Sequence, residues 1–288
     1  MDRTKALVVA AFLFTGCSRP RHIVVGSKNF TEQVVLGEIV AQKIEQKLGI
    51  KVDRKLNLGG TLLAHEALRT GAIDVYPEYT GTALTAVLKK PPSTDPKLVR
   101  DMVADDYAKK WKMIWLPPLG FDNTFAMVVR NPDAGSVATL SAAAASRSWR
   151  LGVGYEFLQR QDGLPGLLKT YPLRLEGSPV TMDLGLLYSA LQQSKVDMVA
   201  ASATDGVLSV LPVKVLEDDR KYFPPYECAV VVKQEALDRE PSLRSALEEL
   251  SGKIDSGAMR KMNYAVDGQH RQASDVAAEF LNHRFEGR

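Results

Sequence analysis

Cysteine is scarce in this sequence, and so are long apolar runs and blocks of one charge. The 288 residues include two cysteines, Cys17 and Cys228, so at most one intramolecular disulfide could form. The net charge at pH 7 is +3, and no Lys/Arg block is present that could follow a phosphate backbone, which argues against nucleic acid as a partner. No apolar run reaches the roughly 20 residues needed to cross a bilayer.

The familiar catalytic and metal-binding motifs are also missing. The four histidines are scattered along the chain, and none has the HExxH spacing of a metalloprotease. There is no Gly-x-Ser-x-Gly elbow and no Walker loop. Gly152-Val153-Gly154 has Phe157 where a dinucleotide-binding loop has its third glycine. The sequence therefore predicts a protein that is not an enzyme and uses no cofactor or metal.

The N-terminus has the features of an export signal. A basic start is followed by an apolar run over 6–14, and Thr15-Gly16 stand directly before Cys17. These features are typical of a signal peptide. Small residues before a cysteine also resemble the lipobox of bacterial lipoproteins, although Phe14 stands where that box usually has Leu. We predict a signal peptide over 1–16 and a mature chain held at the membrane only by a lipid on Cys17. A plain secretory signal with an incidental cysteine is the alternative.

Beyond this signal, the hydrophobic pattern alternates between strands and helices. A β-rich run over 22–25 is followed by apolar residues at helical spacing over 30–47, and the alternation continues toward the C-terminus. Asn29, with Glu32 three residues later, has the shape of a helix N-cap. Strands that alternate with helices of this length predict an α/β fold with mainly parallel strands.

One pattern of helix, tight turn and strand occurs twice. Ala67-Leu68 with Ile73-Asp74-Val75 is matched 123 residues later by Ala190-Leu191 with Val196-Asp197-Met198. The repeat predicts two lobes of similar build that face each other, with chance similarity between two α/β units as the alternative. Ligands of α/β sheets bind beyond the carboxyl ends of the strands, near helix N-termini. Two such lobes would place two sets of strand ends around one cleft.

Several motifs, in order along the chain, resemble those of one known family. They are Gly26-Ser27-Lys28-Asn29-Phe30-Thr31-Glu32-Gln33, Leu58-Gly59-Gly60-Thr61, Tyr76-Pro77-Glu78-Tyr79-Thr80-Gly81-Thr82, Thr204-Asp205-Gly206 and Phe223-Pro224-Pro225-Tyr226. From about residue 22 to 285 the chain resembles the glycine betaine/choline/osmoprotectant-binding proteins of ABC transporters. The resemblance implies a two-lobed, periplasmic-binding-protein-like fold of type II that closes like a hinged clamshell. Lobe one would span 22–122 and 225–288, and lobe two 123–224.

The resemblance also implies a function and partners. The chain would be a monomeric solute-binding protein in the periplasm or at the cell surface. It would bind a small zwitterionic or quaternary-ammonium solute between its lobes and deliver it to an ABC transporter permease with its ATPase. Two alternatives stay open. The same fold could bind a different solute, such as an amino acid or a bulkier betaine, or it could sense a ligand without serving a transporter.

The chemistry of a betaine indicates which side chains such a site needs. A methylated ammonium group is held best by aromatic faces, worth about 0.5–2 kcal/mol each, whereas a carboxylate needs a cation, a hydroxyl or helix N-terminal amides. By resemblance, the carboxylate side would be Lys28, Thr82 and Arg160, and the aromatic walls would be Tyr79, Phe125 and Tyr226. Each has an ordinary alternative, namely a solvated Lys28, an N-cap role for Thr82, a surface pair of Arg160 with Asp162, and core packing for the rings.

One position departs from the family pattern. The family typically has a Tyr two residues before the Thr-Asp-Gly motif, and this sequence has Ser202 there. The internal repeat pairs Ser202 with Tyr79, so the missing ring would have faced the remaining one. Phe125 also stands where Tyr is common. A cage open on one side should bind a bare trimethylammonium group less tightly, or accept a bulkier head group.

Overall fold

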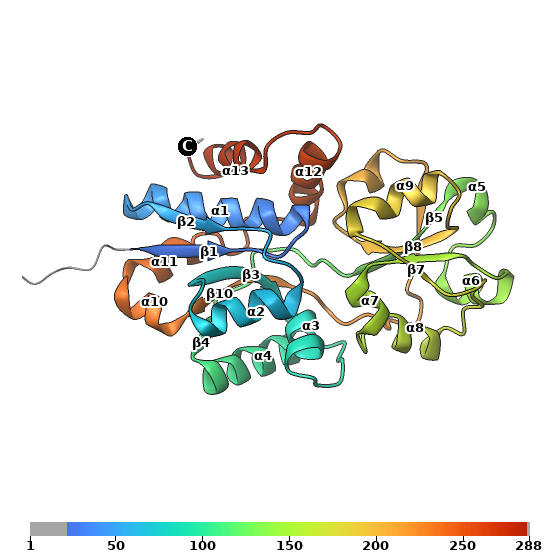
Figure 1. Ribbon diagram of the computed structural model, residues 1–288, viewed down its shortest axis with the longest axis horizontal. Helices are drawn as coiled ribbons and strands as arrows, with labels where there is room; N and C mark the ends of the chain where they lie inside the picture. The colour runs from blue at the N-terminus through green and yellow to red at the C-terminus, as the bar shows by residue number, and fades with distance from the viewer. Residues whose placement is uncertain (1–21, 287–288) are drawn as a thin grey trace, which may run out of the picture.

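The computed structural model describes residues 22–286, so the predicted signal peptide and Cys17 lie outside the described residues. The strands form two five-stranded sheets. Figure 1 shows the sheets side by side along the long axis, each with its own helices, joined by two extended segments. We name the part built on the sheet with β1 the first lobe and the part built on the other sheet the second lobe. Among the described residues, no helix is long and apolar enough to cross a membrane.

The first sheet has the order β2-β1-β3-β10-β4. Its strands are β1 (Ile23–Gly26), β2 (Val52–Lys55), β3 (Val75–Tyr79), β4 (Met113–Trp115) and β10 (Cys228–Lys233). β1 runs parallel to β2 and β3, and β10 runs antiparallel to both of its neighbours. The sheet is therefore mainly parallel, as predicted, with one reversed strand that returns from the second lobe.

Helices cover both faces of the first sheet (Figure 1). One face carries α1 (Thr31–Leu48), α10 (Gln234–Arg239), α11 (Ser242–Glu248), α12 (Ser256–Asp267) and α13 (Ala273–Leu281), which is followed by a π-helical turn (Asn282–Glu286). The other face carries α2 (Thr61–Thr70), α3 (Thr80–Thr82) with a π-helical turn (Ala83–Val87), and α4 (Pro96–Trp111). Ile23 and Val25 pack toward the first group and Val24 toward the second. A strand buried on both faces reads as an unbroken apolar run, which explains the β-rich start of the chain.

The second sheet has the order β7-β6-β8-β5-β9. Its strands are β5 (Phe125–Arg130), β6 (Leu151–Val153), β7 (Val180–Thr181), β8 (Met198–Ser202) and β9 (Val213–Leu216). Its helices are α5 (Asn131–Ala134), α6 (Leu140–Ser146), α7 (Tyr155–Gln159), α8 (Leu164–Thr170) and α9 (Leu187–Gln192), with 3-10 turns at Leu184–Leu186 and Gly206–Ser209.

The two sheets repeat one topology. β3 and β8 occupy the same central place, and each lies beside an antiparallel strand, β10 or β5, that follows a passage between the lobes. The sequence repeat falls on α2 with β3 and on α9 with β8, so Tyr79 and Ser202 end equivalent strands. The repeat in the sequence therefore corresponds to a repeat in the structure.

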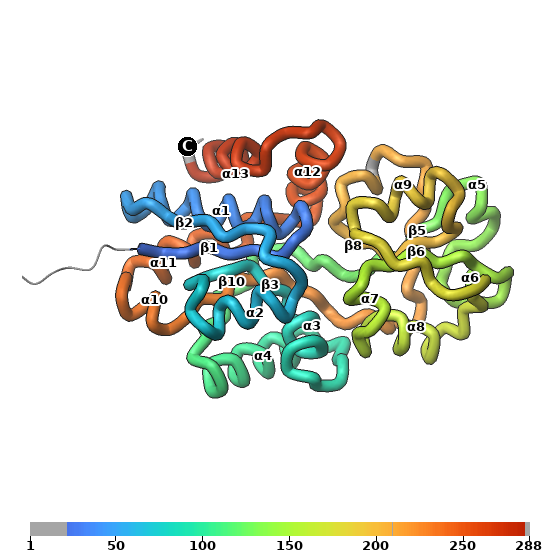
Figure 2. Tube along the Cα trace, in the orientation of Figure 1, coloured from blue at the N-terminus to red at the C-terminus, as the bar shows by residue number. Residues whose placement is uncertain are grey.

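The chain passes between the sheets twice, once between β4 and β5 and once between β9 and β10 (Figure 2). The two passages run antiparallel and are bonded to each other. Asn123 N donates to the Tyr226 carbonyl at 3.1 Å, and Tyr226 N donates to Asp122 Oδ2 at 2.8 Å. We name residues 116–124 and 217–227 the crossing segments.

The predicted capping roles near the site are wrong. α1 begins at Thr31, and the residue at its N-cap position is Phe30, whose side chain makes no capping bond. Glu32 points inward instead, because side-chain donors from distant segments bind its carboxylate. Thr82 lies inside α3 and stands directly before the π-helical turn Ala83–Val87, but its side chain makes no capping bond there.

Candidate ligand-binding site between the two lobes

The seven residues predicted from the sequence lie where the two lobes meet. The first lobe contributes Lys28 after β1, Tyr79 at the end of β3 and Thr82 in α3. The second contributes Phe125 at the start of β5, Arg160 after α7 and Ser202 at the end of β8, and Tyr226 lies on the second crossing segment. The carboxyl ends of β1, β3, β6 and β8 thus point toward one region, as expected for ligand sites in α/β sheets.

A close approach between chain segments shapes this region. A Cβ atom added at Gly81 would lie 2.5 Å from the Pro225 carbonyl and 2.8 Å from the ring of Tyr226. Only a residue without a side chain lets the turn after β3 rest against the second crossing segment. This contact sets Thr82 beside the residues of the second lobe.

Lys28 is not a solvated lysine, because it is only 3% exposed. Its ammonium group forms an ion pair with Glu78, with Nζ 2.5 Å from Oε1, and it lies 5.1 Å from the centre of the Tyr79 ring. Glu78 is fully buried and also accepts from Tyr76 Oη at 3.1 Å and from Tyr79 N at 2.7 Å. The positive charge of Lys28 therefore has an internal carboxylate partner at the wall of the site.

Arg160 joins the two lobes. Its Nε and Nη2 donate to Asp162 at 2.9 and 2.5 Å, and Nη2 also donates to Thr82 Oγ1 of the first lobe at 3.2 Å. The pairing with Asp162 that the sequence suggested is present, but it is buried and not at the surface. Asp162 accepts further from the hydroxyls of Thr85 and Tyr226, both at 2.7 Å. Burial opposes ionisation of Asp162, yet the bonds and charge of Arg160 outweigh it and lower the pKa of this carboxyl.

Aromatic rings form two groups around these ion pairs. Phe125 packs edge-on against Phe157 and Tyr226, with ring centres 4.8 and 5.4 Å apart, and lies 5.6 Å from Phe223. Tyr79 stacks on Phe30 at 6.4 Å. The Arg160 guanidinium lies 5.4 Å from the Phe125 ring, within the range of a cation–π contact.

Glu32 links the Tyr79 ring to both lobes. Its carboxylate accepts from Tyr79 Oη at 2.6 Å, Asn123 Nδ2 at 2.8 Å, Thr204 Oγ1 at 2.5 Å and Asn263 Nδ2 at 3.0 Å. These donors come from β3, the first crossing segment, the second lobe and α12. Burial raises the pKa of Glu32, and the four hydrogen bonds offset this only in part. The Tyr79 hydroxyl is therefore held by the protein itself.

Ser202 lies directly opposite Phe125 in the pairing of β5 with β8. Its amide donates to Asp205 Oδ2 at 3.0 Å, and Tyr188 Oη donates to the same oxygen at 2.9 Å. Burial raises the pKa of Asp205 to about 6. The Thr-Asp-Gly motif thus holds the turn after β8 through Asp205 and ties it to the first lobe through Thr204.

A carboxylate from the second lobe, Glu156 of α7, also reaches the first lobe. Its Oε1 accepts from Thr61 N at 2.5 Å and its Oε2 from Thr61 Oγ1 at 2.9 Å, at the N-terminus of α2. A side chain at Gly60 would collide with this carboxylate. Burial would raise the pKa of Glu156, but the charge of Lys28 and the bonds from Thr61 lower it.

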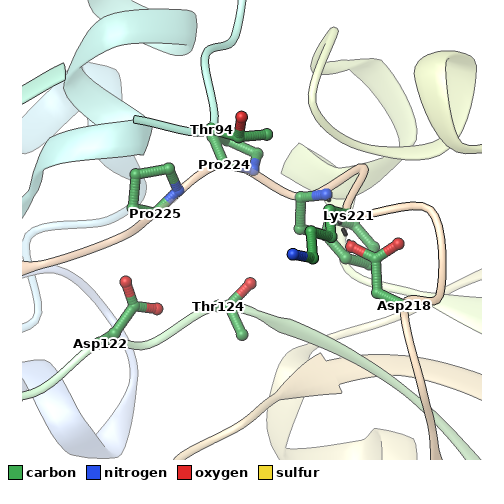
Figure 3. A pocket seen from close by; sticks show the side chains of 8 residues that line it. Thr94, Asp122, Thr124, Asp218, Lys221, Pro224 and Pro225 are labelled. Atoms are coloured by element: carbon green, nitrogen blue, oxygen red, sulfur yellow. Dashed lines mark hydrogen bonds between the residues drawn. The ribbon is translucent and has the colours of Figure 1, made fainter. Parts of the chain in front are cut away.

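A surface depression of about 290 Å³ lies beside the crossing segments and not among the seven predicted residues. It is lined by Thr94, Asp122, Thr124, Asp218, Lys221, Phe223, Pro224 and Pro225 (Figure 3). Asp218 accepts from the amides of Tyr222 and Phe223 at 2.9 Å each, and so holds the turn before the second crossing segment. This depression therefore lies at the connection between the lobes.

Several residues of the site were not identified from the sequence. Glu32, Thr61 and Glu78 lie within the recognised motifs, which is the signal that could have identified them. Phe223 likewise lies within a recognised motif, whereas Glu156 and the ring of Phe157 carry no comparable signal, because their roles depend on contacts with the opposite lobe or with distant rings. Among residues 22–286, no group of three or more His, Cys, Asp or Glu side chains is arranged to hold a metal ion.

Comparisons with known proteins point to one family. The family model described as the substrate binding domain of ABC-type glycine betaine transport systems matches residues 21–283. The chain is 31% identical over 297 residues to the carnitine transport binding protein OpuCC of Listeria monocytogenes, covering 98% of this chain and 96% of that protein. It is 34% identical over 263 residues to the ergothioneine transport permease/ergothioneine binding protein EgtU of Helicobacter pylori, covering 90% of this chain and 47% of that protein.

A solved structure agrees with these sequence matches. The crystal structure of a glycine betaine/carnitine/choline ABC transporter superimposes with a TM-score of 0.77 at 32% identity. The match covers 91% of this chain and 99% of the chain in that crystal structure. The similarity therefore extends over both lobes and both crossing segments.

Proposed function

This chain belongs to the family of substrate-binding domains of ABC-type glycine betaine transport systems, and on that premise we propose that it binds a solute carrying a methylated ammonium group between its two lobes. The family and the two-lobed type II fold expected from the sequence are confirmed. Proteins of this family are extracytoplasmic and act as transporter components, not as enzymes. The identity of the solute and the residues that hold it are the content of the proposal.

One observation supports the proposal most directly. Side chains of opposite lobes converge on one region, where the Arg160 guanidinium of the second lobe bonds Thr82 of the first at 3.2 Å and lies beside Phe125. In this assignment, Tyr79, Phe125 and Tyr226 hold the cationic group, and Ser202 leaves the cage open on one side. Lys28, Thr82 and Arg160 form the polar end. A ligand that touches both lobes would favour the closed arrangement over an open one.

The lobe boundaries belong to the same proposal. We place lobe one at 22–122 and 225–288 and lobe two at 123–224, with the hinge in the crossing segments. The hydrogen bonds between Asn123 and Tyr226 and between Tyr226 and Asp122 support this, because paired strands can flex together while the sheets stay rigid. Small-angle X-ray scattering with and without glycine betaine should give a smaller radius of gyration with the ligand, and an unchanged radius would contradict a hinge.

A thermal-shift screen of the mature chain tests the ligand class. The panel contains glycine betaine, choline, carnitine, ergothioneine, glycine and proline. A ligand present at one hundred times its dissociation constant stabilises the folded state by about 2.7 kcal/mol. We expect at least one methylated ammonium compound to raise Tm, while glycine and proline leave it unchanged. A shift from an amino acid alone would instead favour the open alternative of a different solute.

The departure at Ser202 supports a second candidate solute, a betaine with a bulkier head group. The chain is 34% identical to a protein whose name assigns ergothioneine, and its own cage lacks one ring. A larger Tm shift with ergothioneine than with glycine betaine or choline would favour this candidate.

We also propose how the protein is anchored at the membrane and which partner it binds. The signal peptide over 1–16 is removed, a lipid on Cys17 anchors a monomer, and the lobes present the solute to an ABC permease with its ATPase. Mass spectrometry of the native protein should find an N-terminal peptide that begins at lipidated Cys17. In the Cys17→Ser variant, the protein should leave the membrane fraction. An unmodified N-terminus, or cleavage at another position, would contradict the anchor and leave a plain secretory signal.

A further inference from the structure

The position of the Glu156 carboxylate suggests a role in ligand choice. It belongs to α7 of the second lobe, yet it accepts from Thr61 N at 2.5 Å and Thr61 Oγ1 at 2.9 Å in the first lobe. Thr61 begins the ten-residue helix α2, whose N-terminal amides favour a negative charge. The carboxylate of Glu156 thus lies at a helix N-terminus, which is the kind of position that a ligand carboxylate would take.

The residues assigned to the ligand carboxylate lie around this same group. Arg160 Nη1 is 3.6 Å from Glu156 Oε2, and Nη2 of the same guanidinium bonds Thr82 at 3.2 Å. The charge of Lys28 is close enough to favour the ionised form of Glu156. The predicted carboxylate side of the site is therefore already in contact with a carboxylate of the chain.

The balance of charge around the site points the same way. Both cations have their own carboxylate partner, Lys28 with Glu78 and Arg160 with Asp162, each at 2.5 Å. Glu156 adds a third carboxylate, which shares the single charge of Arg160 with Asp162, and Glu32 lies behind Tyr79. A zwitterion would bring one more carboxylate and no net charge. A ligand with a single positive charge would offset the excess.

We propose that Glu156 is a specificity-determining residue that fills the carboxylate position, so that the site prefers a methylated monocation, such as choline, to a zwitterion of the same head group. This rests on the proposed function, since it concerns the choice among ligands of that one site. Glu156 need not touch the ligand to act, because the repulsion between two carboxylates reaches beyond contact. Its side chain is 43% exposed, so solvent weakens the effect without removing it.

Choline and glycine betaine provide the test, because both carry a trimethylammonium group and differ at the other end. Choline ends in a hydroxyl and glycine betaine in a carboxylate. Isothermal titration calorimetry gives the dissociation constants of both ligands at pH 7 and constant salt. It is applied to the wild type, Glu156→Gln and Glu66→Gln. Glutamine keeps the size of Glu156 and an oxygen that can accept from Thr61. Glu66 is the matched control, since it is an exposed glutamate of α2 that pairs with Arg69 at 2.6 Å.

We expect the wild type to bind choline more tightly than glycine betaine. Glu156→Gln should shift the ratio of the two dissociation constants toward glycine betaine by about fivefold, the size expected for one like charge at a partly exposed position. Glu66→Gln should leave the ratio unchanged. A loss of packing or closure would weaken both ligands together, so the ratio separates a role in specificity from a merely structural one.

The possible results distinguish this inference from the proposed function. If both ligands bind and Glu156→Gln does not move the ratio, or if the wild type prefers glycine betaine, the role of Glu156 is refuted while the proposed function stands. If neither ligand, nor carnitine or ergothioneine, binds the wild type, the proposed function itself fails.

Discussion

Replacing Arg160 by methionine should destabilise the folded protein strongly, because it leaves the buried charge of Asp162 without its cation. The Asp162 side chain is fully buried and that of Arg160 is 10% exposed. Removing one partner of a buried ion pair typically costs about 3–5 kcal/mol. Asp162 keeps two hydroxyl donors, Thr85 and Tyr226 at 2.7 Å, so we expect the lower end, about 3 kcal/mol.

The cost should depend on pH in a definite direction. In the wild type, burial would raise the pKa of Asp162, but Arg160 lowers it, so this pair contributes stability above the unfolded pKa that is lost as the pH falls through the folded pKa. In Arg160→Met the burial remains without the cation, and the pKa of Asp162 should rise above its ordinary value. The variant then regains stability as the pH falls, because protonation removes the unpaired charge. The difference from the wild type should therefore shrink between pH 7 and about pH 4.5.

Urea unfolding of a double-mutant cycle measures both effects. The cycle contains the wild type, Arg160→Met, Asp162→Asn and the double variant, each at the two pH values. The double variant should lose less than the sum of the single losses, with a coupling of about 2 kcal/mol. Arg69→Met, which breaks an exposed pair with Glu66, is the matched control and should change stability little. Additive losses, or a loss of equal size at both pH values, would refute this account of the pair.

Three further predictions concern the ring cage and a second buried carboxyl. Ser202→Tyr places a ring opposite Phe125 and should tighten methylated ligands specifically; calorimetric affinities that stay the same for choline and glycine betaine would contradict the open cage. Tyr79→Ala should weaken such ligands by about 1–2 kcal/mol, whereas Tyr79→Phe keeps the ring, loses the hydroxyl that bonds Glu32 and Gln33, and should bind nearly as the wild type does. The pKa of Asp205 is raised to about 6 in the folded state, so protonation relieves the cost of its buried charge as the pH falls. Between pH 7 and pH 4, the free energy of unfolding of the wild type should therefore rise by about 2 kcal/mol relative to that of Asp205→Asn. If urea unfolding gives parallel pH profiles for the two proteins, Asp205 is not buried as a charge.

The features that sequence reasoning identified correctly are those encoded in neighbouring residues. The alternation of strands and helices follows from apolar spacing within each segment, and α1, β3 and β8 lie within a few residues of their predicted positions. The repeat at an offset of 123 residues predicted two similar units, and both sheets have the same strand order. The resemblance of the motifs also named Lys28 and Tyr79, whose role in binding stays a prediction. Both lie at the carboxyl end of a strand, where α/β sheets bind ligands.

The partners of those residues could not be read in the same way. Nothing in the sequence near Glu156 indicates that it bonds Thr61, 95 positions away, or that Glu32 collects donors from four separate segments. The local pattern around Glu32 even suggested a cap, and it was wrong because buried donors compete better for a carboxylate than the exposed end of a helix does.

The sequence by itself therefore determined the fold class and the family, and it named seven residues that we propose for the site. Only the tertiary structure decided that the pair of Arg160 with Asp162 is buried, that Lys28 pairs with a buried carboxylate and that a third carboxylate reaches across the lobes. The physical reason is that periodicity and motifs act over a few residues. The pairing of charges instead depends on which distant segments the two sheets bring within about 4 Å of each other.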